Sequence, residues 1–183
     1  MQTTADPKEF GAITLPAWES KAIVLQLLLL FSASIVLPSA AHALGLPVRT
    51  FLPMHWPVVL AGLCYGWRSG AIIGLSAPAL SYLLSGMPPV LMLPAMTLEL
   101  GVYGFIAGLS RQILKLGWFS STLLALLAGR GFFIGYVFAT GAVSSSFVNY
   151  LQTAMIPGLI GALGQVIALP LIARRWVGTR SVN

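Results

Sequence analysis

The chain has 183 residues, of which 57% are hydrophobic and 8% are charged, and its mean hydropathy is +0.90. Soluble domains carry roughly a quarter charged residues, so this composition excludes a soluble enzyme, a disordered chain and a nucleic-acid-binding protein. It predicts an integral membrane protein, and at about 20 residues per span the chain has room for at most six or seven spans. The single cysteine excludes an intramolecular disulfide.

Residues 1–20 hold three of the four acids and no long apolar run, which predicts an interfacial tail. The first predicted span, 22–37, ends at Pro38, and a loop is expected over 38–50. The other predicted spans are about 51–66, 71–85, 90–109, 122–140 and 150–173, with a tight turn at 67–69. We therefore expect an all-α bundle of six transmembrane helices over residues 21–175, followed by a short tail at 176–183.

The basic residues predict the orientation of these six spans. Six spans place both termini on one side of the membrane, and most basic residues fall on that same side. They are Lys8, Lys21, Arg68, Arg111, Lys115, Arg174, Arg175 and Arg180. Arg49 alone falls on the other side, and Arg130 lies within a span. The positive-inside rule therefore predicts cytoplasmic termini and explains the net charge of +6 without nucleic acid.

The loops predicted on the outer side, 38–50, 86–89 and 141–149, are rich in Pro, Gly, Ser and Asn. Irregular backbone near a membrane face needs burial by protein or contact with water, so we expect these loops to fold over an outward-facing pocket. Small residues at four-residue spacing predict close helix packing inside the bundle, or contact with a partner protein. They are Gly62, Gly66, Gly70, Gly74, Gly104, Gly108, Gly131 and Gly135.

Glu99 and Arg130 are the two ionisable residues well inside predicted spans. Each would cost about 2.5 to 3.5 kcal/mol facing lipid at mid-bilayer, so both are expected to face inward. They either form a structural ion pair or line the pocket and contact a polar ligand. The chain has no nucleotide-binding GxxxxGK[ST] loop, which excludes an ATPase, so any energy source must come from elsewhere.

Cys64 and His55 lie nine residues apart on one predicted helix, and both are possible metal ligands. That spacing separates them by about 13 Å along the axis and places them on different faces, so one small metal ion cannot bind both. From the residues alone, Cys64 is either a packing residue or a ligand, and His55 either an interfacial anchor or a ligand. No base or acid stands at a helical spacing that would activate Cys64 as an enzymatic nucleophile.

Aromatic and thioether side chains collect near the predicted outer face. They are Phe51, Met54, Trp56, Tyr82, Met87, Tyr136, Phe147 and Tyr150. Such residues form the ordinary aromatic belt of membrane proteins, or they suit a large, flat, partly apolar ligand with a polar edge.

Three segments carry a resemblance to a known family: 49–74 (RTFLPMHWPVVLAGLCYGWRSGAIIG), 85–89 (SGMPP) and 99–104 (ELGVYG). With these segments, the chain resembles a substrate-binding S-component of energy-coupling-factor (ECF) vitamin transporters over residues 21–175. It is most similar to the BtuM family of solitary cobalamin S-components of Gram-negative bacteria. This resemblance implies capture of cobalamin from the periplasm at the inner membrane, with a cysteine thiolate, here Cys64, as axial cobalt ligand and His55 as the fallback.

The resemblance also implies that the thiolate can remove cyanide from cyanocobalamin, and that the chain works with an ECF energising module of a transmembrane subunit plus ATPases, or alone. We expect no intrinsic cofactor, since cobalamin is the transported ligand. The residues expected to line the pocket are His55, Trp56, Met87, Glu99, Arg130, Tyr136, Asn149 and Tyr150. Two alternatives stay open: an S-component for biotin, thiamine or a pantothenate-like acid with Cys64 structural, and a thiol-dependent intramembrane enzyme or structural adaptor.

Overall fold

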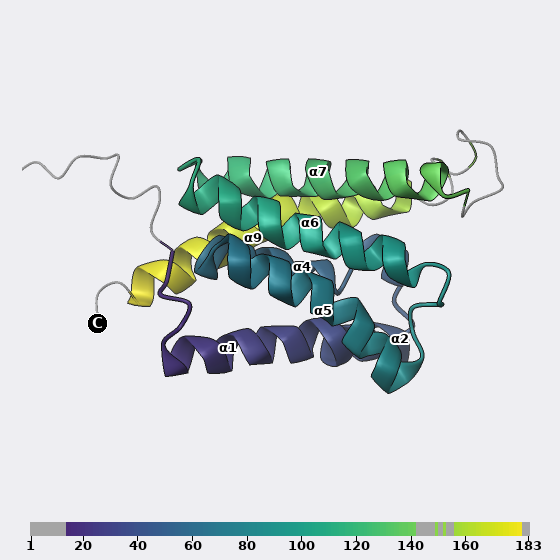
Figure 1. Cartoon of the computed structure of the whole chain (residues 1–183), viewed down its shortest axis with the longest axis horizontal. Coiled ribbons are helices and arrows are strands. Elements are labelled where there is room, and N and C mark those ends of the chain that lie inside the picture. Colours follow the sequence, from purple (N-terminus) through teal and green to yellow (C-terminus); the bar gives the residue numbers. More distant parts are fainter. Residues whose placement is uncertain (1–13, 142–148, 150–151, 153–155, 181–183) are drawn as a thin grey trace, which may run out of the picture.

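The computed structural model describes residues 14–141, 149, 152 and 156–180, and every regular element in that part of the chain is a helix (Figure 1). The longest are α1 (Ser20–Phe31), α4 (His55–Tyr65), α5 (Trp67–Ser85), α6 (Leu93–Gln112), α7 (Trp118–Ala139) and α9 (Ile156–Arg180). They run back and forth, so the start of α1 and the end of α9 lie at one end of the bundle, which we call the termini end (Figure 1). The opposite end is called the far end. The predicted all-α class is confirmed.

Four helical segments are long and apolar enough to cross a membrane. They are Ser20–Ala43, Leu93–Gln112, Trp118–Ala139 and Ile156–Gly178. Helix α4 has 11 residues and a length of about 16 Å, much less than a hydrocarbon core of about 30 Å. The structure therefore supports a multi-pass membrane protein with four candidate spans, while six spans and cytoplasmic termini stay predictions.

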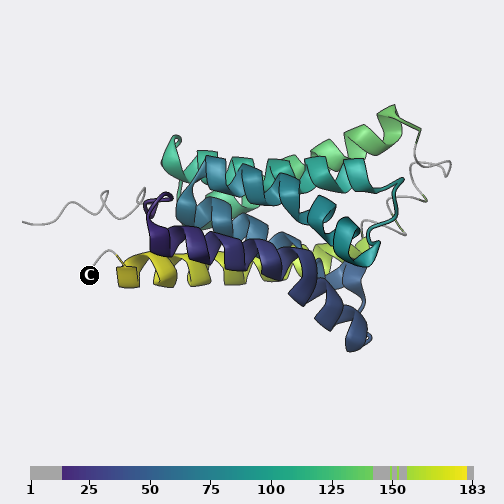
Figure 2. The same ribbon diagram turned by 60° about the horizontal axis from the view of Figure 1, so that its bottom comes forward.

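The helix that begins at Ser20 does not end at Pro38. It continues through a π-helical turn, η2 (Ser32–Val36), into α2 (Leu37–Ala43), and a short helix, α3 (Val48–Phe51), follows. The predicted loop over 38–50 is therefore wrong. Pro38 stands in the first turn of α2, where a missing N–H is tolerated, and the wider π turn lies just before it. Figure 2 shows the chain bending here, so that α2 leaves the line of α1.

A single residue, Gly66, joins α4 to α5. Its φ of +91° lies in a region that residues with a Cβ rarely adopt, and an added Cβ would meet the side chain of Gln112. Because the turn needs only this residue, α5 starts at Trp67, and the predicted turn over 67–69 is wrong. The two helices form a tight hairpin whose turn lies at the termini end.

Glycines bring the backbones of α4, α5 and α6 into close contact. A Cβ added at Gly70 would meet the backbone of Gly104, and one at Gly74 would meet the backbone of Leu100. Gly62 on α4 faces Gly104 in the same way. Such approach supplies van der Waals packing in a bilayer, where lipid removes the hydrophobic drive for helices to associate.

The remaining glycines of the predicted stripe divide into two groups. Gly108 packs against the backbone of Trp67 and so extends the same contact. Gly131 and Gly135 on α7 have open space where a Cβ would stand. Internal packing is therefore confirmed for α4, α5 and α6, and these two glycines of α7 take no part in it.

The described surface is apolar, while polar side chains are buried. Large apolar residues such as Leu27, Ile160 and Leu163 are more than half exposed. The buried polar residues are Ser34, His55, Ser69, Ser81, Glu99, Ser110, Arg111, Ser121, Thr122 and Gln165. This distribution is the one expected of a bundle whose outer surface meets lipid and whose polar groups turn toward one another.

Candidate functional site

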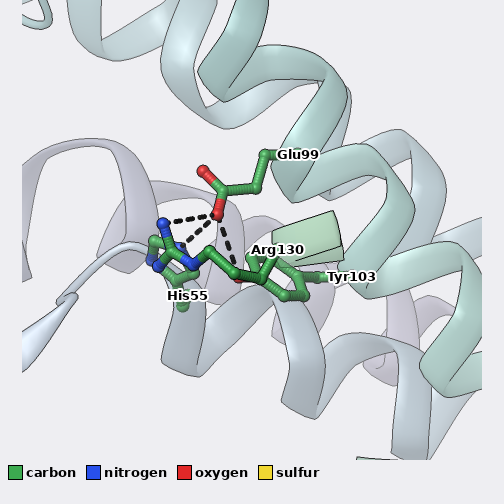
Figure 3. A network of polar contacts seen from close by, with 4 residues as sticks. All are labelled: His55, Glu99, Tyr103 and Arg130. Atoms are coloured by element: carbon green, nitrogen blue, oxygen red, sulfur yellow. Dashed lines mark hydrogen bonds and ion pairs between the residues drawn. The ribbon is translucent and has the colours of Figure 1, made fainter. Parts of the chain in front are cut away.

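Four side chains meet inside the bundle around one carboxylate oxygen, Oε1 of Glu99 (Figure 3). The hydroxyl of Tyr103 donates a hydrogen bond to it at 2.9 Å, and Nη1 of Arg130 forms an ion pair with it at 3.1 Å. Nε2 of His55 lies 3.8 Å from the same atom. We call these four residues the Glu99 network.

Three helices supply the network. His55 is the first residue of α4, Glu99 and Tyr103 lie one turn apart on α6, and Arg130 comes from α7. The rings of His55 and Tyr103 are 4.9 Å apart between centroids. Gly129 allows α7 to approach, because a Cβ there would meet the Tyr103 ring.

The four residues of the Glu99 network differ in how far they are buried. Glu99, His55 and Tyr103 are buried, whereas the side chain of Arg130 is 27% exposed. Both ring nitrogens of His55 are buried and have no hydrogen-bond partner among the described residues. The ion pair expected between Glu99 and Arg130 is present, and contact of either residue with a ligand stays a prediction.

The chemistry available at the network is recognition of a polar group. A guanidinium offers several N–H donors in a fixed fork, and an imidazole offers one donor and one acceptor when neutral. The only cysteine, Cys64, is not among the four residues. Within the described part of the chain, no group of three His, Cys, Asp or Glu side chains could hold a metal ion.

Cys64 lies at the termini end, near the last turn of α4, and is completely buried in the main apolar core. Its backbone carbonyl accepts a hydrogen bond of 2.7 Å from the N–H of Leu15, and Leu15 and Ala17 pack against the same core. The structure thus separates Cys64 from His55 along α4, as their spacing predicts. The role of Cys64 as a cobalt ligand stays a prediction.

The other predicted pocket residues are dispersed. Trp56 donates from Nε1 to the carbonyl of Phe51 at 3.0 Å, and Tyr136 packs against a small cluster with Phe133. Met87, between α5 and α6, is 47% exposed, and Asn149 is exposed. Tyr150 lies outside the described residues. The structure does not bring Trp56, Met87 or Tyr136 into the Glu99 network.

A second arginine, Arg111 at the end of α6, is fully buried at the termini end. Its Nη1 donates to the carbonyl of Leu116, and its guanidinium lies 3.6 Å from the centroid of the Trp118 ring. Nε and Nη2 are buried and have no hydrogen-bond partner in the described structure. The sequence placed Arg111 only in a basic connection between helices, so its burial was not predicted.

Tyr103 was also missed as a member of the network. Its position four residues after Glu99 places the two on one face of α6, and this spacing could have indicated the contact.

The comparisons with known proteins give one match. Residues 22–178 match the family model described as the ECF transporter, substrate-specific component. No curated protein and no solved structure matches the sequence.

Proposed function

The chain belongs to the ECF transporter substrate-specific components, and we propose that the substrate it binds is cobalamin, with the Cys64 thiolate as axial ligand of the corrin cobalt. Membership of this family makes the chain a membrane transport protein with a vitamin as the expected substrate. The observation that carries the choice of cobalamin is the resemblance over 49–74, which includes Cys64, the only thiol of the chain.

This ligation exchanges one anionic ligand of cobalt, cyanide, for another, the thiolate. The thiol loses its proton to water, the thiolate sulfur forms a bond to cobalt, and the bond between cobalt and cyanide breaks. Cyanide leaves with its electron pair, so the oxidation state of cobalt does not change. Thiolate suits this exchange because it is a soft, strongly donating ligand.

Cys64 is fully buried in the described conformation, so ligation requires the helices around α4 to separate. His55 is therefore a second candidate for the cobalt ligand. It opens α4, its two ring nitrogens have no described hydrogen-bond partner, and it lies beside the partly exposed Arg130. An imidazole nitrogen is also a suitable ligand for cobalt in the corrin ring.

The burial of Cys64 also favours a second candidate function. A cysteine packed among apolar side chains acts as a small hydrophobe, and the substrate would then be biotin, thiamine or a pantothenate-like acid. In that case the Glu99 network would recognise the polar part of the vitamin without any bond to a metal.

One spectroscopic experiment separates these candidates. Detergent-purified protein is incubated with cyanocobalamin and desalted, and its absorption spectrum is compared with those of Cys64→Ala and His55→Ala. Ser81→Ala, a change at another small buried side chain, is the matched control. We expect the wild type and the control to retain a spectrally shifted corrinoid and to release cyanide.

Each outcome assigns the ligand. Loss of the shift in Cys64→Ala alone supports the proposal, and loss in His55→Ala alone moves the ligand to His55. An unshifted corrinoid retained equally by all variants removes both residues from cobalt. Failure of the wild type to retain any corrinoid rejects cobalamin and favours another vitamin.

A further inference from the structure

Arg130 is the most exposed member of the Glu99 network in the described conformation. Its side chain is 27% exposed, whereas that of Glu99 is 3% exposed and that of His55 is 5% exposed. Tyr103 is buried as well. A polar group that approaches the network therefore meets the guanidinium first.

The guanidinium has donors left for a substrate. Nη1 faces Glu99 Oε1, and an arginine carries five N–H donors in a planar fork. Phe133 flanks the guanidinium, with 5.7 Å between its ring centroid and Cζ. Among the described residues, Glu99 is the only acid in ion-pair contact with Arg130. Glu99 therefore holds the guanidinium at Nη1, and the remaining N–H donors are available to a substrate.

Glu99 positions the Arg130 guanidinium and is itself held by contacts with two other residues. Its Oε1 also accepts the hydrogen bond from Tyr103 and lies 3.8 Å from His55 Nε2. A side chain held at one nitrogen loses less conformational entropy when it binds a second partner. Glu99 is thus a positioning residue, and Arg130 is the residue that faces the substrate.

From this geometry we infer that Arg130, positioned by Glu99, determines specificity by binding an acidic oxygen group of the vitamin. Planar paired donors match the oxygens of phosphate and carboxylate. The inference rests on the proposed function for the identity of the group: in cobalamin it is the phosphate that links the nucleotide to the corrin ring. In an acidic vitamin such as biotin it is the carboxylate.

The test compares three corrinoids that share one ring: cobalamin, cobinamide phosphate and cobinamide. Cobinamide phosphate keeps the phosphate without the nucleotide, and cobinamide lacks both. We expect wild type to bind the first two at least about 10-fold more tightly than cobinamide, as charge-assisted hydrogen bonds imply. Arg130→Gln removes this preference, so that the affinities for the three corrinoids agree within about twofold of one another. Arg130→Lys keeps part of it, because the charge remains and the fork is lost.

Two variants control the comparison. Arg68→Gln removes an exposed arginine at the termini end and is expected to leave all three affinities unchanged. Glu99→Gln keeps the shape of the positioning residue and removes its charge, so we expect it to reduce the phosphate preference by less than Arg130→Gln does. The thermal midpoint of each variant, measured without ligand, separates loss of recognition from loss of fold.

The outcomes distinguish this inference from the proposed function. Equal weakening of all three corrinoids in Arg130→Gln assigns Arg130 a structural role and overturns the inference while cobalamin stands. If wild type binds no corrinoid, the proposed function fails, and the same variants are tested with biotin and with thiamine. Binding of biotin that Arg130→Gln abolishes still supports the inference. Binding of thiamine alone, which has no acidic group, overturns it.

Discussion

Two arginines of the bundle, Arg130 in the middle of α7 and Arg111 near the end of α6, have different surroundings. Arg130, in the Glu99 network, is partly exposed and pairs with a buried carboxylate. Arg111, at the termini end, is fully buried, and no carboxylate among the described residues forms an ion pair with it. It lies over the Trp118 ring and donates to the Leu116 carbonyl. One arginine is balanced by an opposite charge, and the other by an aromatic face and the backbone.

Because their partners differ, the two arginines are suited to different tasks. A guanidinium paired with an acid and open to the surface can exchange or add partners, as a binding site requires. A guanidinium enclosed by an aromatic ring and a backbone carbonyl fixes the connection from α6 to α7, with Leu116 and Trp118 on either side of Gly117. Ligand recognition by Arg130 is therefore the role to test, whereas Arg111 stabilises the connection between α6 and α7.

The largest effect on stability is expected from Arg130→Met. It leaves the buried Glu99 carboxylate without its charged partner, and breaking a buried pair in this way costs about 3 to 5 kcal/mol. The free energy of unfolding, measured by denaturant titration in mixed micelles, checks this value. The double variant Glu99→Leu with Arg130→Met is the control, because it leaves no buried charge and should recover most of the loss. Equal losses in the single and double variants would contradict the pairing.

A smaller loss, about 1 to 2 kcal/mol, is expected from Arg111→Met in the same titration. The substitution removes the contact with Trp118 and one hydrogen bond, but it also removes a buried charge and leaves no carboxylate unpaired. Trp118→Leu, which removes the aromatic face alone, should cost a similar amount. A loss from Arg111→Met as large as that from Arg130→Met would show that Arg111 pairs with a buried acid.

The smallest effect concerns residues 14–18 at the termini end. Gln26 donates from Nε2 to the carbonyl of Ala17 at 2.7 Å, and Leu15 donates to the carbonyl of Cys64. Gln26→Ala removes a bond of about 0.5 to 1.5 kcal/mol and should loosen this segment. We expect a maleimide reagent to label Cys64 about two- to tenfold faster.

The matched control is Ser85→Ala, which removes a side-chain bond to the carbonyl of Ser81 at the end of α5. Its labelling rate should equal that of the wild type. An unchanged rate in Gln26→Ala would mean that residues 14–18 do not limit access to Cys64.

The sequence predicted the parts of the structure that depend on composition and on local spacing. Apolar runs gave the helices, and the four-residue glycine spacing identified the close packing of α4, α5 and α6. Glu99 and Arg130 could be paired because charged residues within spans avoid lipid and face one another inside the bundle. These predictions held because the bilayer restricts the choices open to the chain.

The sequence failed where the outcome depends on contacts between distant segments. Pro38 normally marks a helix end, but a π turn before it allows the helix to continue. The burial of Arg111 depends on how Trp118 folds back across the α6–α7 connection, and no local pattern records that arrangement. His55 joins the Glu99 network because three helices converge, which spacing along α4 alone cannot reveal.

The short helix α4 has a consequence for how the protein is made. It has 11 residues, ten of them buried, and α5 is attached to it through Gly66 alone. A helix of about 16 Å is too short to span the hydrocarbon core by itself when it leaves the ribosome. The hairpin of α4 and α5 must therefore enter the membrane as a unit. Gly62 of α4 can pack against Gly104 only after α6 has been synthesised.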